Sequence, residues 1–167
     1  MSDIRILRFL QSLQLFEGFS VDQLQTMGSL LQLQLVPPRG HLFKEGDAGD
    51  EFFFVMEGEV GVFKQIPGAD LERLTTLGPR AMVGQLCLID GQPRSATCTA
   101  ITRTLVLRGE RRLFDRLFTQ GDPLAFRFID VITRELCQHL RATNQHLYDL
   151  YDHPEQTSIR LRAVAHQ

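Results

Sequence analysis

The chain has 167 residues, about the length of one ordinary domain, so a second independent domain is not expected. Its 18 basic and 20 acidic residues give a formal net charge of −2. This balance lacks the excess of Lys and Arg with which proteins neutralise a phosphate backbone, and it argues against nucleic acid as the default partner.

The first third of the chain is expected to be helical, in two pieces. Apolar residues recur at helical spacing from Asp3 to about Leu15, which predicts a first helix. A second helix is predicted from Val21 to Leu31, because Ser20 and Gln23 have the spacing of a capping box. Packing against the rest of the protein is the expected role of both helices.

After Pro37-Pro38 the pattern changes to short runs of β-branched, aromatic and aliphatic residues punctuated by glycine. Short strands at this spacing predict a barrel or a sandwich. The aromatic run Phe52-Phe53-Phe54 is expected to be strand and core. Seven strands are predicted, at Leu33–Val36, His41–Lys44, Glu51–Met56, Glu59–Lys64, Leu71–Leu77, Ala96–Thr102 and Thr104–Arg108.

Helical periodicity returns from Glu110 onward. A short helix is predicted at Arg112–Phe118, and a long one at Pro123–Tyr151, which contains no further Pro or Gly. At 1.5 Å per residue the long helix would extend about 40 Å, so it must project past the strands or pack along another molecule. The polar tail, residues 153–167, is expected to be loosely ordered.

The informative chemistry lies between Gly78 and Ala100. Gly84 lets the backbone approach a ligand closely, and Gln85-Leu86-Cys87 can form a short helix whose first N–H groups favour an anion. Arg94 can meet a phosphate with two parallel hydrogen bonds, and the hydroxyl of Ser95 or Thr97 can join it. The pattern predicts a site for one phosphate group.

This segment resembles the phosphate-binding cassette of the cyclic-nucleotide-binding domains, whose usual form is Phe-Gly-Glu, a short helix, then Pro-Arg-Ser (or Thr, or Ala)-Ala. The similarity extends over about residues 10–150 and includes the upstream run KEGDAGDEFFFVMEGEVGVF. The chain resembles the sensory half of the bacterial catabolite activator family, which shares the two N-terminal helical pieces, the roll and the long helix. The resemblance implies a mainly β fold with flanking helices, a jelly-roll-like β-roll: one domain over 1–152, with helices in 3–31, the roll at 33–108 and helices in 110–151.

The resemblance also assigns roles to individual residues. Arg94 and Ser95 would bind the exocyclic oxygens of the cyclic phosphate. The backbone amides after Gly84, those of Gln85, Leu86 and Cys87, would bind the sugar-phosphate. On the long helix, Thr143 and Asn144 stand where the catabolite activator has a Thr-Ser pair that reaches the adenine, the second residue coming from the other subunit.

Two positions depart from the usual cassette. Gln85 replaces the glutamate that receives the ribose 2′-hydroxyl, and Val83 replaces the aromatic residue. A neutral hydrogen bond contributes about 0.5–1.5 kcal/mol, against about 1.5–3 kcal/mol for one to a charged group. Ligand affinity is therefore expected to be about tenfold lower than with glutamate. The loss of charge could also suit a more acidic ligand.

Arg94 has a structural alternative. In a roll that has lost its ligand, Arg94 would be buried and paired with a carboxylate, and Gln85 is the kind of change that such a loss leaves behind. The retention of Gly84, Arg94 and Ser95 favours ligand binding, because an unpaired arginine in a pocket is costly. Arg80, where the family often has glycine, is expected to lie in solvent.

These features lead to one hypothesis of function and one alternative. The hypothesis is a regulatory sensor, not an enzyme, that binds a cyclic purine mononucleotide, cAMP ahead of cGMP, with a cyclic dinucleotide as a further possibility. Closure of the long helix over the base would couple occupancy to an effector protein that the sequence does not identify. The alternative is a degenerate roll that binds another protein without any nucleotide.

Enzymatic and DNA-binding functions find little support. A metal centre of the cupin type needs several histidines on the strands, and His41 is the only histidine of the predicted roll. His139, His146 and His153 recur every seven residues, about 10 Å apart, too far for one helix to chelate a metal. Only about fifteen polar residues follow the long helix, where the family has a helix-turn-helix. Neither a metal nor DNA binding is expected.

The long helix also predicts a parallel homodimer. Its apolar stripe is broader than one roll needs to cover, and the alternative is that the helix folds back over its own roll. The stripe consists of Ile129, Leu136, Thr143 and Leu150, which repeat every seven residues, flanked by Ile132, Leu140 and Leu147.

The cysteines and the hydropathy pattern suggest a cytoplasmic protein. Cys87, Cys98 and Cys137 are widely spaced and form no CxxC pair, which fits a reducing compartment. No stretch approaches the roughly 18 apolar residues of a membrane span, and the start lacks the features of a signal peptide. No membrane partner is expected.

Overall fold

The structure is a computed structural model that describes residues 2–66 and 71–152. Contacts between residues divide the chain into two compact units, Met1–Ile129 and Asp130–Gln167. The first unit holds the N-terminal helices, the strands and the start of the long helix. The second holds the remainder of that helix. The expected single domain over 1–152 stays a prediction.

The N-terminal helices are α1 (Ser2–Gln11), a 3-10 turn at Gln14–Phe16, and α2 (Val21–Ser29). The capping box is confirmed, because the Gln23 N–H donates to Ser20 Oγ at 3.2 Å and the Ser20 N–H donates to Gln23 Oε1 at 3.0 Å. The first helix ends earlier than predicted, since the chain becomes extended before the 3-10 turn.

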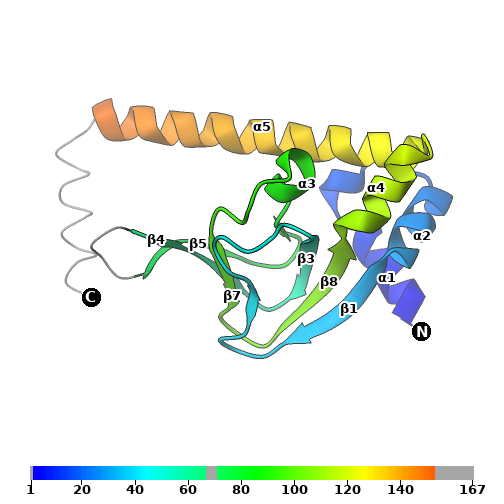
Figure 1. The fold of residues 1–167 in the computed structure, drawn as a ribbon, viewed down its shortest axis with the longest axis horizontal. Helices are drawn as coiled ribbons and strands as arrows, with labels where there is room; N and C mark the ends of the chain where they lie inside the picture. Colours follow the sequence, from blue (N-terminus) through cyan, green and yellow to red (C-terminus); the bar gives the residue numbers. More distant parts are fainter. Residues whose placement is uncertain (1, 67–70, 153–167) are drawn as a thin grey trace. The chain divides into compact units, whose positions relative to one another are not determined.

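In the described residues, eight strands form two four-stranded antiparallel sheets, whose arrangement can be followed in Figure 1. Their orders are β1-β8-β3-β6 and β2-β7-β4-β5. The strands are β1 (Leu31–Val36), β2 (His41–Phe43), β3 (Glu51–Glu57), β4 (Val60–Gln65), β5 (Leu71–Leu77), β6 (Met82–Val83), β7 (Thr97–Ala100) and β8 (Thr104–Glu110). All seven predicted strands are present, with ends displaced by up to two residues, and the fold is the expected antiparallel roll with flanking helices.

Two details differ from the sequence-based prediction. Leu31 was expected to end a helix, but it begins β1 and lies opposite Gly109 of β8, so pairing between strands decides its conformation. The strand β6 was not predicted, because two residues are too few to show an alternating pattern. It pairs with β3 at Phe53 and Phe54, and it leads directly into the candidate site.

Alternation along β3 divides the core into two parts. Phe53 packs inside the roll with residues of both sheets, whereas Phe52 and Phe54 belong to a separate aromatic cluster, as the period of two in a strand requires. In that cluster Phe52 lies 5.3 Å from Phe114, and Phe54 lies 5.7 Å from Phe16, between ring centroids. All three phenylalanines of the run are buried, which confirms the prediction for them.

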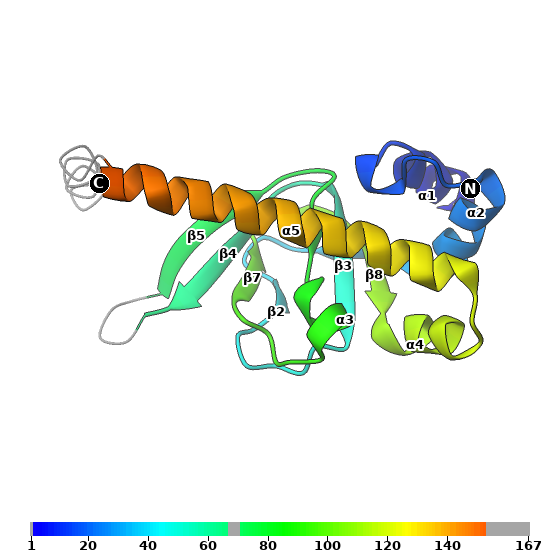
Figure 2. The same cartoon turned by 90° about the horizontal axis from the view of Figure 1, so that it is seen from above.

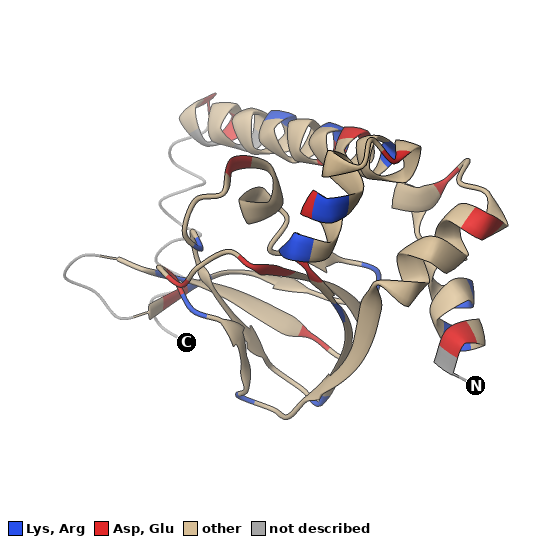
Figure 3. Cartoon of the chain, turned by 45° about the vertical axis from the view of Figure 1, so that its right-hand side comes forward, with Lys and Arg blue, Asp and Glu red and all other residues tan. Residues whose placement is uncertain are grey.

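The short helix α3 (Leu86–Asp90) lies within the cassette, between β6 and β7. After the last strand, α4 (Arg111–Thr119) and α5 (Pro123–Asp152) complete the described chain. α5 is one continuous helix of 30 residues (Figure 2). Its first turns belong to the first unit, where Arg127 donates to the Gly18 carbonyl oxygen at 2.9 Å and to Gln23 Oε1 at 3.0 Å. Basic and acidic residues are interspersed in both units (Figure 3), in keeping with the near balance of charge.

Candidate functional site

Arg94 is a buried cation that has no anionic partner among the described residues. The residue is 4% exposed. Its guanidinium donates from Nη1 to the carbonyl oxygen of Gly84 at 3.2 Å and from Nη2 to that of Glu51 at 2.5 Å, and it lies 4.0 Å from the ring centroid of Phe43. Its Nε is buried and has no hydrogen-bond partner among the described residues. An unsatisfied donor on a buried charge is costly, and an anion would satisfy it.

The structural alternative for Arg94 required a carboxylate, and the described part of the chain supplies none. No Asp or Glu carboxylate oxygen in it lies within 4.0 Å of the Arg94 nitrogen atoms. The backbone carbonyl oxygens of Gly84 and Glu51 take the hydrogen bonds in its place. They stabilise the orientation of the guanidinium but do not neutralise its charge.

Gly84 makes the burial of Arg94 possible. Its φ is +83°, a conformation that favours glycine. A Cβ built at this position would lie 2.6 Å from Arg94 Nη1, so no larger residue fits without displacing the guanidinium. Val83, the preceding residue, is 3% exposed and belongs to the roll core, where it fixes the end of β6.

The short helix α3 follows directly. Gln85 is its N-cap residue, half-buried, and its side chain caps no backbone N–H. Leu86 is exposed, whereas Cys87 is buried against Gly49, where a Cβ would lie 2.2 Å from that of Cys87. Arg111 Nη1 donates to the Cys87 carbonyl oxygen at 2.7 Å. α3 is therefore held by the loop before β3 and by the first residue of α4.

The two hydroxyls near Arg94 have different surroundings. Thr97 is buried, and its Oγ1 accepts a hydrogen bond from the Glu45 N–H at 2.9 Å. Ser95 is exposed, and its carbonyl oxygen accepts a hydrogen bond from Lys64 Nζ at 2.7 Å. Thr97 thus serves the internal structure of the roll, and Ser95 is the hydroxyl that solvent reaches.

The cysteines of this unit are packing residues. Cys87 and Cys98 are buried and free. Burial raises the pKa of the Cys98 thiol to about 12, against a smaller opposing effect of Arg94. The thiol is therefore neutral and unreactive at physiological pH.

Thr143 and Asn144 lie in the second unit, on α5, and both are exposed. The structure therefore gathers Val83, Gly84, Gln85, Leu86, Cys87, Arg94 and Ser95 within the first unit, and it leaves the role of the helix pair a prediction. His139 is also exposed on this helix. The side chain of His146 and all of His153 lie outside the described residues.

Sequence reasoning missed the residues that surround Arg94. Phe43 and Glu51 contact its side chain, and Gly49 packs on α3. Their signal was present in the KEGDAGDEFFFV run, which carries Gly49 and Glu51 and was noted only as typical of the family. Glu51 and Phe43 lie 43 and 51 positions from Arg94 in the sequence. Contacts at such a separation produce no local periodic pattern from which they could be predicted.

The described residues form neither a metal centre nor a membrane-spanning helix. They contain no group of three or more His, Cys, Asp or Glu side chains arranged to hold a metal ion. No helix among them combines the length and the apolar character needed to cross a bilayer.

Comparisons with known proteins agree with this geometry. The family model for the cyclic nucleotide-binding domain matches residues 33–121. A CRP-like cAMP-activated global transcriptional regulator of Mycobacterium tuberculosis is 32% identical over 71% of this chain, and the match spans only 52% of that relative, about half its length.

Solved structures show the same fold. A cyclic nucleotide-binding domain from Methylobacillus flagellatus has a TM-score of 0.77 at 27% identity, covering 88% of this chain and 83% of that one. The regulatory subunit of a cAMP-independent protein kinase A from Trypanosoma brucei has a TM-score of 0.68 at 20% identity, covering 80% and 48%. At that identity the second likeness shows the fold alone.

Proposed function

The chain belongs to the cyclic nucleotide-binding domain family, and we propose that it is a sensor that binds a cyclic purine mononucleotide through Arg94. The observation that carries the proposal is the burial of this arginine, whose Nε has no hydrogen-bond partner and whose guanidinium has no carboxylate beside it in the part of the chain that the structure describes. A cyclic phosphate would supply the missing negative charge and accept parallel hydrogen bonds from the guanidinium. A buried cation with a vacant donor is costly unless a ligand uses it.

The remaining contacts of the proposed pose follow from the cassette. The amides of Gln85, Leu86 and Cys87 bind the sugar-phosphate, and the exposed Ser95 hydroxyl joins Arg94 at the phosphate. Thr143 and Asn144 of α5 reach the base. We favour cAMP over cGMP, and the name of the M. tuberculosis regulator supports this order.

Calorimetric titration of the wild-type protein tests the proposal. The titrants are cAMP, cGMP, a cyclic dinucleotide and, as the control, 5′-AMP. This control has the base and the sugar of cAMP, but its phosphate is not closed into a ring with the 3′-oxygen. We expect one cyclic mononucleotide bound per chain, cAMP the more tightly, and weaker binding of 5′-AMP. Absence of binding by every cyclic nucleotide would overturn the proposal.

Exchanging the amide of Gln85 for a carboxylate is expected to tighten binding. Gln85→Glu should raise the affinity for cAMP about tenfold, because a charged acceptor strengthens the hydrogen bond to the ribose 2′-hydroxyl. The measurement is titration of both proteins with cAMP and with 2′-deoxy-cAMP, which lacks that hydroxyl. The gain should disappear with the deoxy ligand. Weaker binding of cAMP by the variant would mean that the ligand adopts another pose.

A second candidate is a protein-interaction module that binds no nucleotide. The observation that favours it is the amide of Gln85, since it removes the charged acceptor for the ribose. In this case Arg94 would serve only to stabilise the roll, through its hydrogen bonds to the carbonyl oxygens of Gly84 and Glu51.

We further propose that ligand occupancy changes the position of α5 and thereby the affinity for an effector protein. Such coupling requires the ligand to bind two helix positions with different affinity. We infer that the protein acts in the cytoplasm, which its free cysteines support, that it is not an enzyme, and that it uses neither a metal nor DNA.

We expect a homodimer formed through α5. Leu140 and Leu147, seven residues apart, are 61% and 48% exposed, and a second helix would cover them. Light scattering should give twice the 19.0 kDa of one chain. Leu140→Glu with Leu147→Glu should give one chain, because each charge would be buried without a partner. Gln138→Glu with Gln145→Glu, at the same spacing on the opposite face, is the control and should remain dimeric.

A further inference from the structure

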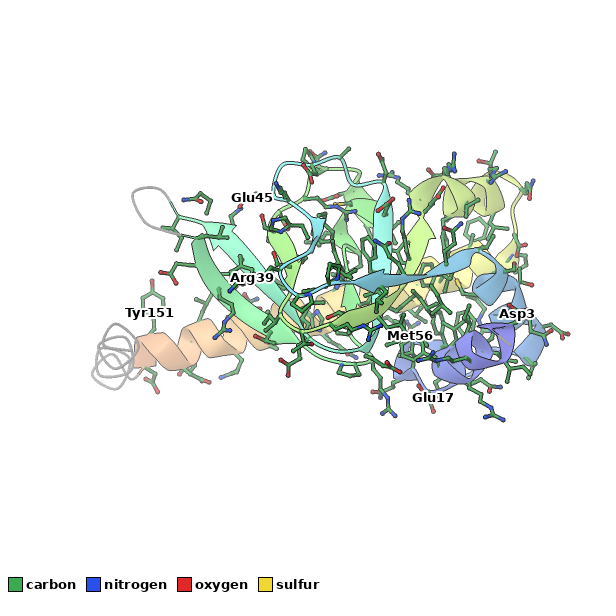
Figure 4. The ribbon with its side chains drawn as sticks, turned by 90° about the horizontal axis from the view of Figure 1, so that it is seen from below. Asp3, Glu17, Arg39, Glu45, Met56 and Tyr151 are labelled. Atoms are coloured by element: carbon green, nitrogen blue, oxygen red, sulfur yellow. The ribbon has the colours of Figure 1, made fainter. Side chains whose placement is uncertain are left out.

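Lys64 and Glu45 connect segments around the candidate site. Glu45 lies on the turn after β2 (Figure 4), and Lys64 lies on β4. Lys64 Nζ donates to Glu45 Oε1 at 2.5 Å and to the Ser95 carbonyl oxygen at 2.7 Å. Glu45 Oε2 accepts a hydrogen bond from the Gln65 N–H at 3.2 Å. One ammonium group therefore joins the turn, β4 and the residue after Arg94.

The turn that carries Glu45 holds the main chain of Arg94. The Arg94 N–H donates to the Asp47 carbonyl oxygen, and the Gly46 N–H donates to the Arg94 carbonyl oxygen, both at 2.9 Å. The turn is closed by the Asp47 carboxylate, which accepts a hydrogen bond from the Lys44 N–H at 2.8 Å. The position of the turn therefore determines the position of the Arg94 main chain, and with it that of the side chain.

The ion pair contributes little to stability. The side chains of Lys64 and Glu45 are 41% and 30% exposed, and pairs exposed to this extent are weak contributors to folding. The hydrogen bond from Lys64 is the main cause that lowers the pKa of Glu45, so its carboxylate is charged at neutral pH. Without Lys64 this negative charge would lack its counter-ion on the turn that holds the main chain of Arg94.

We propose that Lys64, with Glu45 as its counter-ion, is a positioning residue for the ligand site. It holds the turn and the Ser95 carbonyl so that Arg94 and Ser95 meet the phosphate together. This inference rests on the proposed function, because it names the support of the same site. It adds two residues that lie 30 or more positions from the cassette's arginine in the sequence.

Lys64→Met keeps the length of the side chain and removes its charge. We expect the affinity for cAMP to fall about tenfold, the order of one charge-assisted hydrogen bond, with little change in the thermal midpoint of the ligand-free protein. Lys64→Arg should restore most of the affinity. Glu45→Gln should lower the affinity for cAMP by less than Lys64→Met does, since Lys64 keeps its hydrogen bond to the Ser95 carbonyl oxygen. If Lys64→Met does not fold, the Glu45→Gln variant tests the same inference.

The matched control is Arg5→Met, which removes the exposed Arg5–Glu57 ion pair of 2.6 Å elsewhere in the first unit. Its affinity for cAMP should equal that of the wild type. Equal affinities for Lys64→Met and the wild type would overturn the positioning role.

Hydrogen exchange of the ligand-free protein separates this inference from the proposed function. The amides of Gly46 and Arg94, which bond the turn to the cassette, should exchange faster in Lys64→Met and at the wild-type rate in Lys64→Arg and Arg5→Met. Unchanged exchange in Lys64→Met overturns the inference whether or not nucleotide binds. If the protein binds no nucleotide but the exchange is faster in Lys64→Met, the link between the turn and the cassette is supported and the proposed binding of a nucleotide is overturned.

Discussion

Replacing Arg94 with alanine is expected to abolish binding of cyclic nucleotide in a protein that stays folded. The change removes two charge-assisted hydrogen bonds to the phosphate, each contributing about 1.5 kcal/mol or more, so the affinity should fall by at least about a hundredfold. Stability should change little. The buried guanidinium has no counter-charge within residues 2–66 and 71–152, and removing its desolvation cost offsets the lost hydrogen bonds to the Gly84 and Glu51 carbonyl oxygens. Calorimetric titration with cAMP and thermal unfolding without ligand measure both effects.

Two further variants distinguish the charge of Arg94 from its hydrogen-bonding geometry and provide a control. Arg94→Lys keeps the charge but cannot make two parallel hydrogen bonds, so its affinity should be intermediate. Arg73→Ala, at an exposed position of β5, should bind as the wild type does. If Arg94→Ala retains full affinity, or if it melts at a much lower temperature with no nucleotide bound by either protein, Arg94 is structural and the second candidate function gains support.

Removing the ring of Phe128 should cost the first unit more stability than any change at the candidate site. Phe128 is fully buried, and its ring centroid lies 4.4 Å from that of Phe114, 5.7 Å from that of Phe52 and 5.9 Å from that of Phe16. Truncation of a buried phenylalanine to alanine costs about 3–5 kcal/mol, because it forfeits burial and leaves a cavity. For a chain of this length the melting temperature should fall by roughly 10 °C.

The control for this prediction lies two residues away on the same helix. Phe126 is 50% exposed and contacts the exposed Phe118. Phe126→Ala should therefore lower the unfolding free energy by less than about 1 kcal/mol. Circular dichroism during thermal unfolding measures both variants. Equal melting temperatures for Phe126→Ala and Phe128→Ala would contradict the packing of this aromatic cluster.

Local signals in the sequence were sufficient for most of the helices and strands and for recognising the cassette, but not for the two-residue strand β6 or for the start of β1 at Leu31. The capping box at Ser20 and Gln23, the strand pattern and the long helix depend on neighbours within a few positions, so they can be read from the chain directly. The spacing of Gly84, Arg94 and Ser95 likewise identified the family, which its model then matched over residues 33–121. The composition of the candidate site, one arginine, one hydroxyl and one glycine, follows from the same spacing, and its role in binding a ligand stays a prediction.

What the sequence could not give is the set of contacts that Arg94 makes. Glu51 and Phe43 reach Arg94 from 43 and 51 positions away, and Lys64 supports Ser95 across 31. Such contacts depend on strand register and loop packing. A local pattern does not encode these, since the same alternation allows many pairings. Only the tertiary structure decided that Arg94 is buried against carbonyl oxygens and an aromatic ring, with one donor that no described residue accepts, because these groups converge only when both sheets are assembled.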